Sequence, residues 1–386
     1  EEDLRVAVVA RVTDDKRVRM RWHGEAIIDL PRQLLNSNGA VKTALVEVET
    51  EPKAVVPQGE NEKLNQSIGA PLSDNFDSSL GRNKVLCEYG GKTGLTQQEG
   101  MVTKFPAEQT RAASVMTYGF FPTIARRCAY LGGYYAVLQS VTKQLALTGE
   151  FQKVRLSMQE FFPSIRGDAR RMGLPFAALL GAFEVMKALN LPAIGGKDSM
   201  SGSFKDIDVP PSLLSFAVSL TDLNQVVSRE LKGGDTKILI TRVPVDPLGL
   251  IDFEVFVQMM AAFSKLHHAG KVLAASSVSE HGLLFTLKDM ALGNAVGLTL
   301  AEGLEDAFLP GNLVFEVAGD CPVDESFFRQ IATTNAQPDQ TEFVRARSEA
   351  LRAVYPGFDR RPTAQIPDFN EVELPALTLT SRKVLI

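Results

Sequence analysis

The sequence predicts an α+β protein made of two domains in tandem. Its 386 residues exceed the usual size of one domain, so two hydrophobic cores are expected. Segments with strand and helix patterns follow one another without the strict alternation that marks a parallel βαβ sheet. A stretch rich in Pro, Gly, Asn and Ser, residues 49–84, has the composition of a linker and sets a short N-terminal segment apart from the rest.

The N-terminal segment, residues 1–48, predicts only part of a domain. Residues 6–30 contain two or three strands broken by an Asp-Asp turn, and Pro31 then starts a short helix through Leu35. So few strands cannot form a stable unit alone. We therefore expect this segment to close the sheet of a domain that lies upstream.

Residues 85–226 predict the first complete domain. One helix has the helical repeat of apolar residues and stops at a glycine, and a second, mostly apolar helix ends before a proline. Three runs of strand character surround them. The expected strands are 84–91, 153–162 and 213–223, and the expected helices are 132–149 and 175–191.

Residues 227–386 predict the second domain. It starts with a turn and a buried strand, followed by an amphipathic helix whose apolar residues recur at spacings of three and four. A tight polar segment at 277–282 separates a later strand from a later helix. The expected strands are 232–243, 271–276 and 312–319, and the expected helices are 252–270 and 283–292.

The composition excludes several functional classes. A net charge of -5 without a long Lys/Arg cluster argues against a nucleic-acid binder, although a small anionic ligand needs only a local site. No apolar run reaches the roughly 18 residues that span a bilayer, and the N-terminus lacks the pattern of a signal peptide. Three widely spaced cysteines fit free thiols in a reducing compartment, so a cytoplasmic location and no membrane partner are expected.

The most informative motif is AIGGKDSMSGSF, residues 193–204, which we expect to form a loop. Its two glycines let the main chain approach a ligand, its lysine offers a charge for phosphate, and its aspartate could reach a metal ion. Its serine hydroxyls could donate to an oxyanion. The spacing is not that of the GxxxxGK[ST] phosphate loop, and the residues alone leave an anion site and a plain glycine turn both open. The candidate binding residues are Gly195, Gly196, Lys197, Asp198, Ser199 and Ser201.

With its flanks, this motif resembles the phosphoribosylformylglycinamidine synthases, the amidotransferases of purine biosynthesis. PAIGGKDSMSGSF is followed by DVPPSLLSFAVS and preceded by QEFF and PFAALLGAFE, and the resemblance to the long, single-chain form extends over essentially the whole chain. That family has a core of four domains, A-B-A-B, each pair resembling aminoimidazole ribonucleotide synthetase. The resemblance implies that residues 85–226 are the second A domain and 227–386 the second B domain, ending at the lead-in to a missing glutaminase domain.

The resemblance implies an ATP-dependent C–N ligase that uses glutamine as nitrogen donor. The intact enzyme would use ATP and Mg²⁺ to convert formylglycinamide ribonucleotide into the amidine, whereas this chain would be inactive alone and hold no tight cofactor. Its partners would be the first A-B half and the glutaminase, normally in the same chain. Gly196, Lys197 and Ser199 would enter a shared active site. Lys197 stands where the family has a metal-binding asparagine, and Asp198 could supply the missing oxygen. Gln159 and Glu160 lie where relatives carry polar residues near the nucleotide.

The resemblance also implies a degenerate second nucleotide site. Family members hold a non-catalytic nucleotide there, with magnesium bound by acidic and amide side chains. Because a lysine in the position of a metal ligand would repel magnesium, we expect no magnesium nucleotide at this site. The residues at the matching positions are Gln109, Gln139, Lys143, Ser277 and Ser279.

Two other functions remain open. The chain could be a scaffold that completes the central barrel and docks the glutaminase without touching substrate. It could also be another ATP-using enzyme of the same superfamily, such as a selenophosphate or thiamine-phosphate enzyme, but those require nucleotide-binding residues that this chain lacks.

Overall fold

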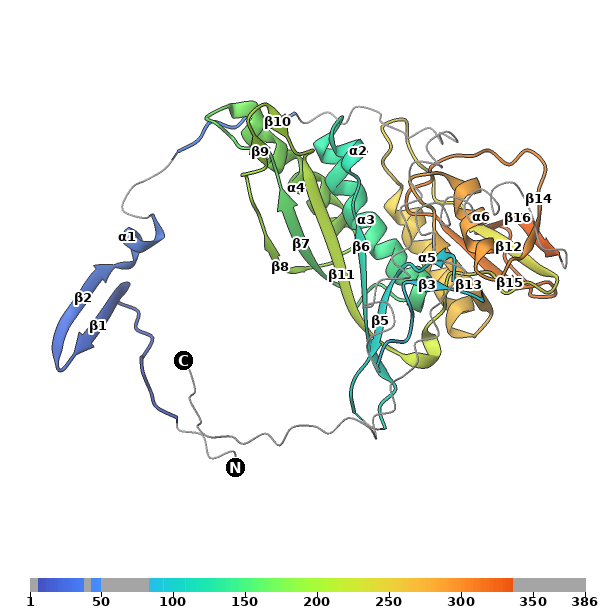
Figure 1. Ribbon diagram of the computed structural model, residues 1–386, viewed down its shortest axis with the longest axis horizontal. Coiled ribbons are helices and arrows are strands. Elements are labelled where there is room, and N and C mark those ends of the chain that lie inside the picture. The colour runs from blue at the N-terminus through green and yellow to red at the C-terminus, as the bar shows by residue number, and fades with distance from the viewer. Residues whose placement is uncertain (1–5, 38–42, 50–82, 93, 108, 336–386) are drawn as a thin grey trace, which may run out of the picture.

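Two five-stranded sheets with their helices form the body of the protein, and a separate hairpin precedes them (Figure 1). The computed structural model describes residues 6–37, 43–49, 83–92, 94–107 and 109–335. Most of the expected linker, and the expected lead-in to a glutaminase domain, therefore lie outside the described residues.

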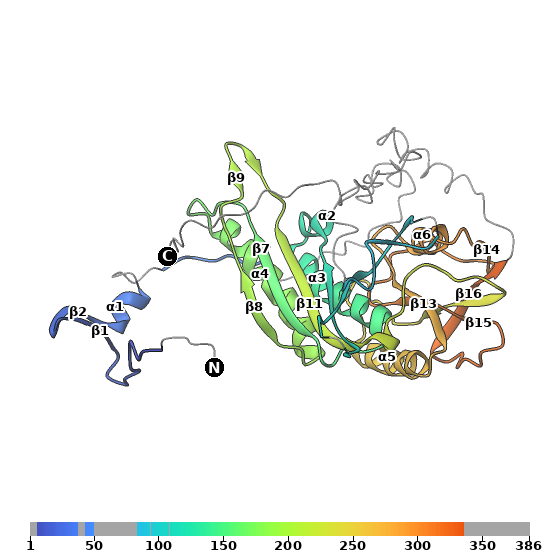
Figure 2. The same cartoon turned by 60° about the horizontal axis from the view of Figure 1, so that its bottom comes forward.

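The first sheet is covered by helices on one face. Its order is β5-β6-β11-β7-β8, with antiparallel pairs except for β7 and β8, which run parallel. The long helices α3 (Ala129–Thr148) and α4 (Ala169–Ala188) lie on the same face (Figures 1 and 2). The strands are β5 Gly100–Lys104, β6 Ala112–Gly119, β7 Arg155–Phe161, β8 Ala193–Lys197 and β11 Ser212–Asp222.

Glycines bring α3 and α4 into close contact. A Cβ on Gly133 of α3 would lie 2.0 Å from the Ala178 carbonyl oxygen, and one on Gly181 of α4 would lie 2.0 Å from the Tyr130 oxygen. Each helix therefore presents its backbone directly to the other, which leaves no room for a side chain at these crossings.

The opposite face of the first sheet carries exposed apolar side chains. Strand register places Met101 of β5 beside Met116 of β6, and Met116 beside Val218 of β11. Because side chains alternate along a strand, Tyr118 and Leu220 project from the same face. Met101, Met116, Tyr118 and Leu220 are all exposed, so this face is apolar and open to solvent among the described residues.

The second sheet is antiparallel throughout and has a helix on each face. Its order is β13-β15-β12-β16-β14. Helix α5 (Phe253–His268) packs against Leu239 and Phe315, while α6 (Leu283–Leu292) packs against Ile238 and Val314, which project from the other face. The strands are β12 Thr236–Thr241, β13 Val272–Ser277, β14 Gly297–Leu300, β15 Leu313–Ala318 and β16 Phe328–Asn335.

The core of the first sheet continues into the second unit through α3. Tyr135 donates a hydrogen bond to the Gly249 carbonyl at 2.7 Å, and the Tyr134 hydroxyl accepts one from the Ile251 amide at 3.1 Å. Buried residues of α3 and α5 belong to the same apolar cluster. The two units therefore share one core at this junction.

Short elements complete the described structure. The N-terminal hairpin and its helix lie apart from the body (Figure 1). None of the described helices combines the length and apolarity needed to cross a bilayer. These elements are β1 Arg17–Trp22, β2 Glu25–Pro31, α1 Arg32–Asn36, β3 Tyr89–Gly90, β4 Thr96–Gln97, α2 Pro122–Ala125, β9 Ser203–Phe204 and β10 Ile207–Asp208.

The mixed α and β content expected from the sequence is confirmed, and three local predictions differ from the structure. Ala193–Lys197, expected as a loop, is the edge strand β8, because the α4 crossover lays it parallel to β7 with Gly196 opposite Met158. The strand expected at 84–91 is reduced to Tyr89–Gly90. Helix α4 also begins earlier than expected, because the Asp168 side chain caps the amides of Arg170 and Arg171.

Candidate functional site

The GGKDSMS segment lies at the carboxyl end of two parallel strands. Lys197 ends β8 and pairs in register with Gln159 of β7, and Gly196 pairs with Met158. A Cβ on Gly196 would lie 2.9 Å from the Met158 oxygen, so glycine allows this close approach. All five residues of β8 are exposed at the outer edge of the sheet. The backbone and the lysine are therefore accessible to a ligand or to a second protein surface.

The residues after β8 are fixed against the end of β7. The Ser199 and Ser201 hydroxyls lie 2.7 Å apart and hydrogen bond to each other. The Phe162 amide donates to the Ser199 carbonyl at 2.8 Å, and the Gly202 amide donates to the Phe162 carbonyl at 2.9 Å. These bonds fix where the two hydroxyls lie relative to Lys197.

A buried carboxyl group lies beside this segment. Glu160 of β7 is 5% exposed. Burial raises its pKa to about 7, and the negative charge of Asp198 adds to the effect. Near pH 7 the buried Glu160 carboxyl therefore exists in both its protonated and its ionised form.

The structure brings together the residues that the sequence assigned to the first site. Gln159 and Glu160 come from β7, and the remaining six come from β8 and the turn that follows it. This group lies at the edge of the sheet and does not line the cavity between the two units that is described next. The first-site residues are Gln159, Glu160, Gly195, Gly196, Lys197, Asp198, Ser199 and Ser201.

A cavity lies between the two units and holds most of the second predicted site. Its volume is about 690 Å³. It is lined by aromatic side chains, among them Tyr118 and Phe285, and by four residues of the predicted degenerate site. Gln109, the fifth, is exposed between β5 and β6 and does not line it. The four that line it are Gln139, Lys143, Ser277 and Ser279.

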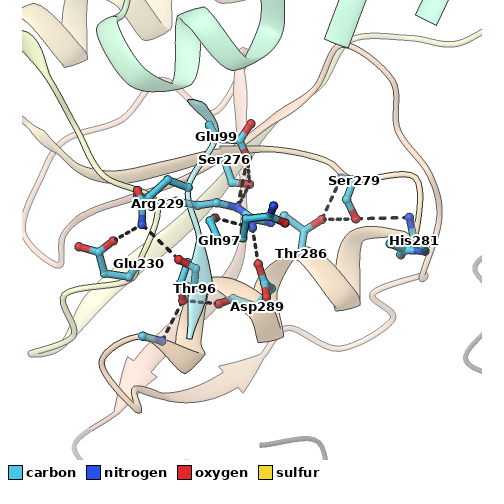
Figure 3. Close-up of polar contacts among 12 residues, drawn as sticks. Thr96, Gln97, Glu99, Arg229, Glu230, Ser276, Ser279, His281, Thr286 and Asp289 are labelled. Carbon is cyan, nitrogen blue, oxygen red and sulfur yellow. Dashed lines mark hydrogen bonds and ion pairs between the residues drawn. The ribbon is translucent and has the colours of Figure 1, made fainter. Parts of the chain in front are cut away.

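A buried ionic cluster forms one wall of this cavity (Figure 3). The Arg229 guanidinium lies between two carboxylates, with Nε 3.1 Å from Oε1 of Glu99 and an ion pair from Nη1 to Asp289. All three side chains are buried. Ser276 and Ser277 donate to the two Glu99 oxygens at 2.8 and 2.7 Å. One positive charge is therefore shared by two carboxylates, and both Glu99 oxygens are also hydrogen bonded within the protein.

Lys143 reaches the cavity from α3. Its Nζ lies 4.5 Å from the centre of the Tyr118 ring, a cation–π geometry. Burial lowers the pKa of Lys143, and the negative charge of Glu99 opposes this shift. Gln139, one turn earlier, donates to Ser277 at 2.8 Å.

The charges around this cavity bear on the expectation that it holds no magnesium nucleotide, which stays a prediction. The described residues contain no group of three or more His, Cys, Asp or Glu side chains that could hold a metal ion. The carboxylates of Glu99 and Asp289 are paired with Arg229, and Lys143 places a further positive charge nearby. Magnesium bound with a nucleotide needs one or two protein carboxylates besides the phosphates, and Glu88 and Glu280 also line the cavity. The expectation therefore rests on the positive charges of Lys143 and Arg229.

The sequence analysis missed the ionic cluster. Glu99, Arg229 and Asp289 lie in three segments separated by 130 and 60 residues, and none belongs to a recognisable motif. Only a charged residue flanked by apolar residues hints at burial in such a case. That hint is too weak to pair residues across so much sequence.

Solved structures establish the class of fold. The structure resembles PurL of Thermotoga maritima solved in complex with AMPPCP, with a TM-score of 0.54 and 17% identity over 83% of this chain and 50% of that chain. The same protein solved in complex with FGAR gives a TM-score of 0.53 at 15% identity, over 83% of this chain and 48% of that one. The fold is therefore that of about half of PurL, with mixed α and β structure.

Curated relatives give the particular resemblance. The phosphoribosylformylglycinamidine synthase subunit PurL of Thermoplasma volcanium is 19% identical over 343 residues, which are 82% of this chain and 45% of the relative. The corresponding subunit of Mycobacteroides abscessus is 24% identical over 78% of this chain and 44% of its own length. No protein-family model matches. The resemblance that GGKDSMS indicated is confirmed, and the chain spans somewhat less than half the length of these relatives.

Proposed function

We propose that this chain is the second half of the synthetase core of a phosphoribosylformylglycinamidine synthase, with no activity of its own. In the intact enzyme, ATP and ammonia from glutamine would convert formylglycinamide ribonucleotide into the amidine. The similarity to PurL subunits over about four fifths of the chain supports this function. Residues 85–226 and 227–386 would be the second A and B domains, and residues 1–48 would close the preceding B domain. The cytoplasmic location stays a prediction.

The observation that carries the proposal is the position of the GGKDSMS segment. Its glycine amides, its ammonium group and two fixed hydroxyls lie at one exposed strand edge. Phosphoryl transfer depends mainly on holding polyanions in place and balancing their charge. Lys197 would supply a positive charge where relatives of the family use a metal-binding asparagine. Asp198, the next residue, offers carboxyl oxygens beside it, whereas the Glu160 carboxyl is buried.

The open apolar face of the first sheet supports a partner half. An antiparallel sheet with helices on one face normally buries the other or keeps it polar. Here Met101, Met116, Tyr118 and Leu220 project from it and are exposed. The first half of the core would cover this face. The same observation keeps the scaffold function open, in which the chain completes the barrel without touching substrate.

Alanine at Lys197 or Ser199 in the intact synthase distinguishes catalysis from a scaffold. We expect turnover to fall by about 100-fold for either variant, the usual cost of removing one group that stabilises developing charge. Steady-state kinetics with purified enzyme would measure this, and Lys153→Ala, an exposed lysine away from the site, is the control. Unchanged turnover with a normal unfolding midpoint would favour the scaffold.

The cavity is expected to bind no magnesium nucleotide. Lys143 places a positive charge in the cavity, and the carboxylates of Glu99 and Asp289 are already paired with Arg229, so a magnesium ion would meet repulsion and competition there. Titration of Mg-ADP into the folded 386-residue chain should release no heat of binding in isothermal calorimetry. Tight, stoichiometric binding would show that this part of the proposal is wrong.

A further inference from the structure

Helix α4 carries large apolar side chains on the side away from the protein core. Its inner face is made of small residues, among them Ala178 and Gly181, which pack against α3. At 100° per residue, four large side chains fall within about 100° of one another on the outer side. We call them the outer stripe of α4. They are Phe176, Leu179, Leu180 and Phe183, and they are between 42% and 58% exposed.

Such a helix is normally covered on both sides. A helix that is apolar all round belongs in an interior, and a contiguous exposed apolar patch marks an interaction site. Arg170 and Lys187 lie at the two ends of the helix, but no charged side chain interrupts the four residues of the stripe except Glu184 on its flank. The stripe therefore fits an apolar protein surface better than a charged ligand.

The chain that precedes the body runs along this helix. The Glu47 amide donates to the Ala169 carbonyl at 3.0 Å, and the Glu47 carboxylate accepts from Arg170 Nε at 3.2 Å. A Cβ on Gly173 would lie 1.9 Å from the Glu47 carbonyl oxygen, so the main chain rests directly on the helix. Gly173 lies one turn before Phe176 and within about 60° of it around the helix axis. The incoming chain thus borders the outer stripe.

The hairpin at the other end of that chain is itself half of an interface. Val18 pairs with Leu30 and Met20 with Ile28 on one face, whereas Arg17 and Asp29 form an ion pair on the other. A two-stranded hairpin is at best marginally stable, so this amphipathic pair needs a further sheet or helix. Figure 1 shows that the described body does not provide it.

The chain length keeps the two surfaces close. Seven residue steps join Asn36, at the end of α1, to Thr43, where the described chain resumes, and they span at most about 25 Å. Four further steps lead from Thr43 to Glu47, which contacts the start of α4, so the domain that the hairpin completes lies within roughly 40 Å of the start of α4. The outer stripe is the apolar surface next to that position.

We propose that the outer stripe of α4 is the docking surface for the domain whose sheet the β1–β2 hairpin completes. This inference rests on the proposed function, because that domain would belong to the first half of the synthetase core. The occupant presents an apolar surface to Phe176, Leu179, Leu180 and Phe183. This contact would hold the first half of the core against α4. The strand β8, which carries the start of the GGKDSMS segment, follows α4 in the chain.

Protection of a cysteine at position 180 tests the docking surface. Leu180→Cys is made both in the 386-residue chain and in the intact synthase, and the alkylation rate of that residue is followed by peptide mass spectrometry. We expect alkylation to be slower by about tenfold or more in the intact enzyme, because docking must open before the thiol reacts. Val257→Cys, an exposed apolar position of α5, is the control and should react equally in both.

The other outcomes overturn the inference. Equal alkylation rates in the two proteins would show that the stripe stays open. Slow alkylation in the 386-residue chain that speeds up on dilution would show that a second copy occupies it. Kinetics of Lys197→Ala in the intact enzyme separate this inference from the proposed function. If Lys197→Ala lowers turnover while Leu180→Cys is alkylated equally fast in both proteins, the proposed function stands and only the docking surface is wrong.

Discussion

Replacing Arg229 with methionine is expected to lower the free energy of unfolding by about 3–5 kcal/mol, the cost of breaking a buried ion pair from one side. The Arg229 side chain is buried between the carboxylates of Glu99 and Asp289. Methionine keeps much of the volume but removes the charge and its donors. Two carboxylates would then remain in a low-dielectric environment without their cation.

Chemical denaturation of the purified 386-residue chain measures this effect. Arg329→Met, at an exposed position of β16, is the matched control and should change the unfolding free energy by less than about 0.5 kcal/mol. Adding Glu99→Gln to Arg229→Met should recover part of the loss, because one stranded charge is removed. A loss below about 1 kcal/mol would mean that water reaches the cluster and that the ion pairs are not truly desolvated.

The same cluster determines the shape of the cavity. Arg229 also donates to the Gln97 carbonyl at 3.0 Å and to Ser276 at 2.8 Å, so one side chain joins the segment before β5 to β13. Thr96 donates to the Asp289 carbonyl at 2.5 Å, which fastens α6 to the same segment. These bonds keep the polar wall of the cavity in one arrangement before any ligand arrives.

Local signals in the sequence predicted the helices best. The stop at Gly149 is confirmed, because that residue takes a left-handed conformation, φ 68°, that glycine adopts without strain. The edge strand β8 was mistaken for a loop, since two glycines, a lysine and full exposure leave no alternating pattern to recognise. Its strand character comes from pairing with β7, which is a tertiary effect.

The candidate sites differ in how far the sequence could define them. Gln139, Lys143, Ser277 and Ser279 were grouped only through the family resemblance, and the structure does place them around one cavity. Gln109 was grouped with them in the same way and lies outside it. Glu99, Arg229 and Asp289 carry the charge of that cavity, yet their pairing depends on how three distant segments pack. No rule of local spacing reports such a contact.

Lowering the pH from 7.5 to 5 is expected to destabilise the chain by about 2 kcal/mol through His267 alone. This side chain of α5 is 3% exposed, and neither ring nitrogen makes a hydrogen bond of normal geometry within the described part of the chain, although the Leu147 backbone interacts weakly with the ring. Burial, with a smaller effect of His268, lowers its pKa to about 4 from the usual 6.5. The unfolded chain therefore binds a proton below pH 6.5 that the folded chain binds only near pH 4. Stability is complete above pH 6.5 and is lost as the pH falls toward 4.

Because His267 lies at the junction between the two units, the loss of stability at low pH would arise at that junction. Its ring packs on the end of α3, where a Cβ on Gly149 would lie 2.6 Å from the ring carbon Cγ. Urea unfolding at pH 7.5 and pH 5 would compare wild type with His267→Leu, which should lose most of its acid sensitivity, and with the exposed His268→Gln, which should retain it. If His267→Leu keeps the full acid sensitivity, other groups cause it, and the junction tolerates a charged imidazole.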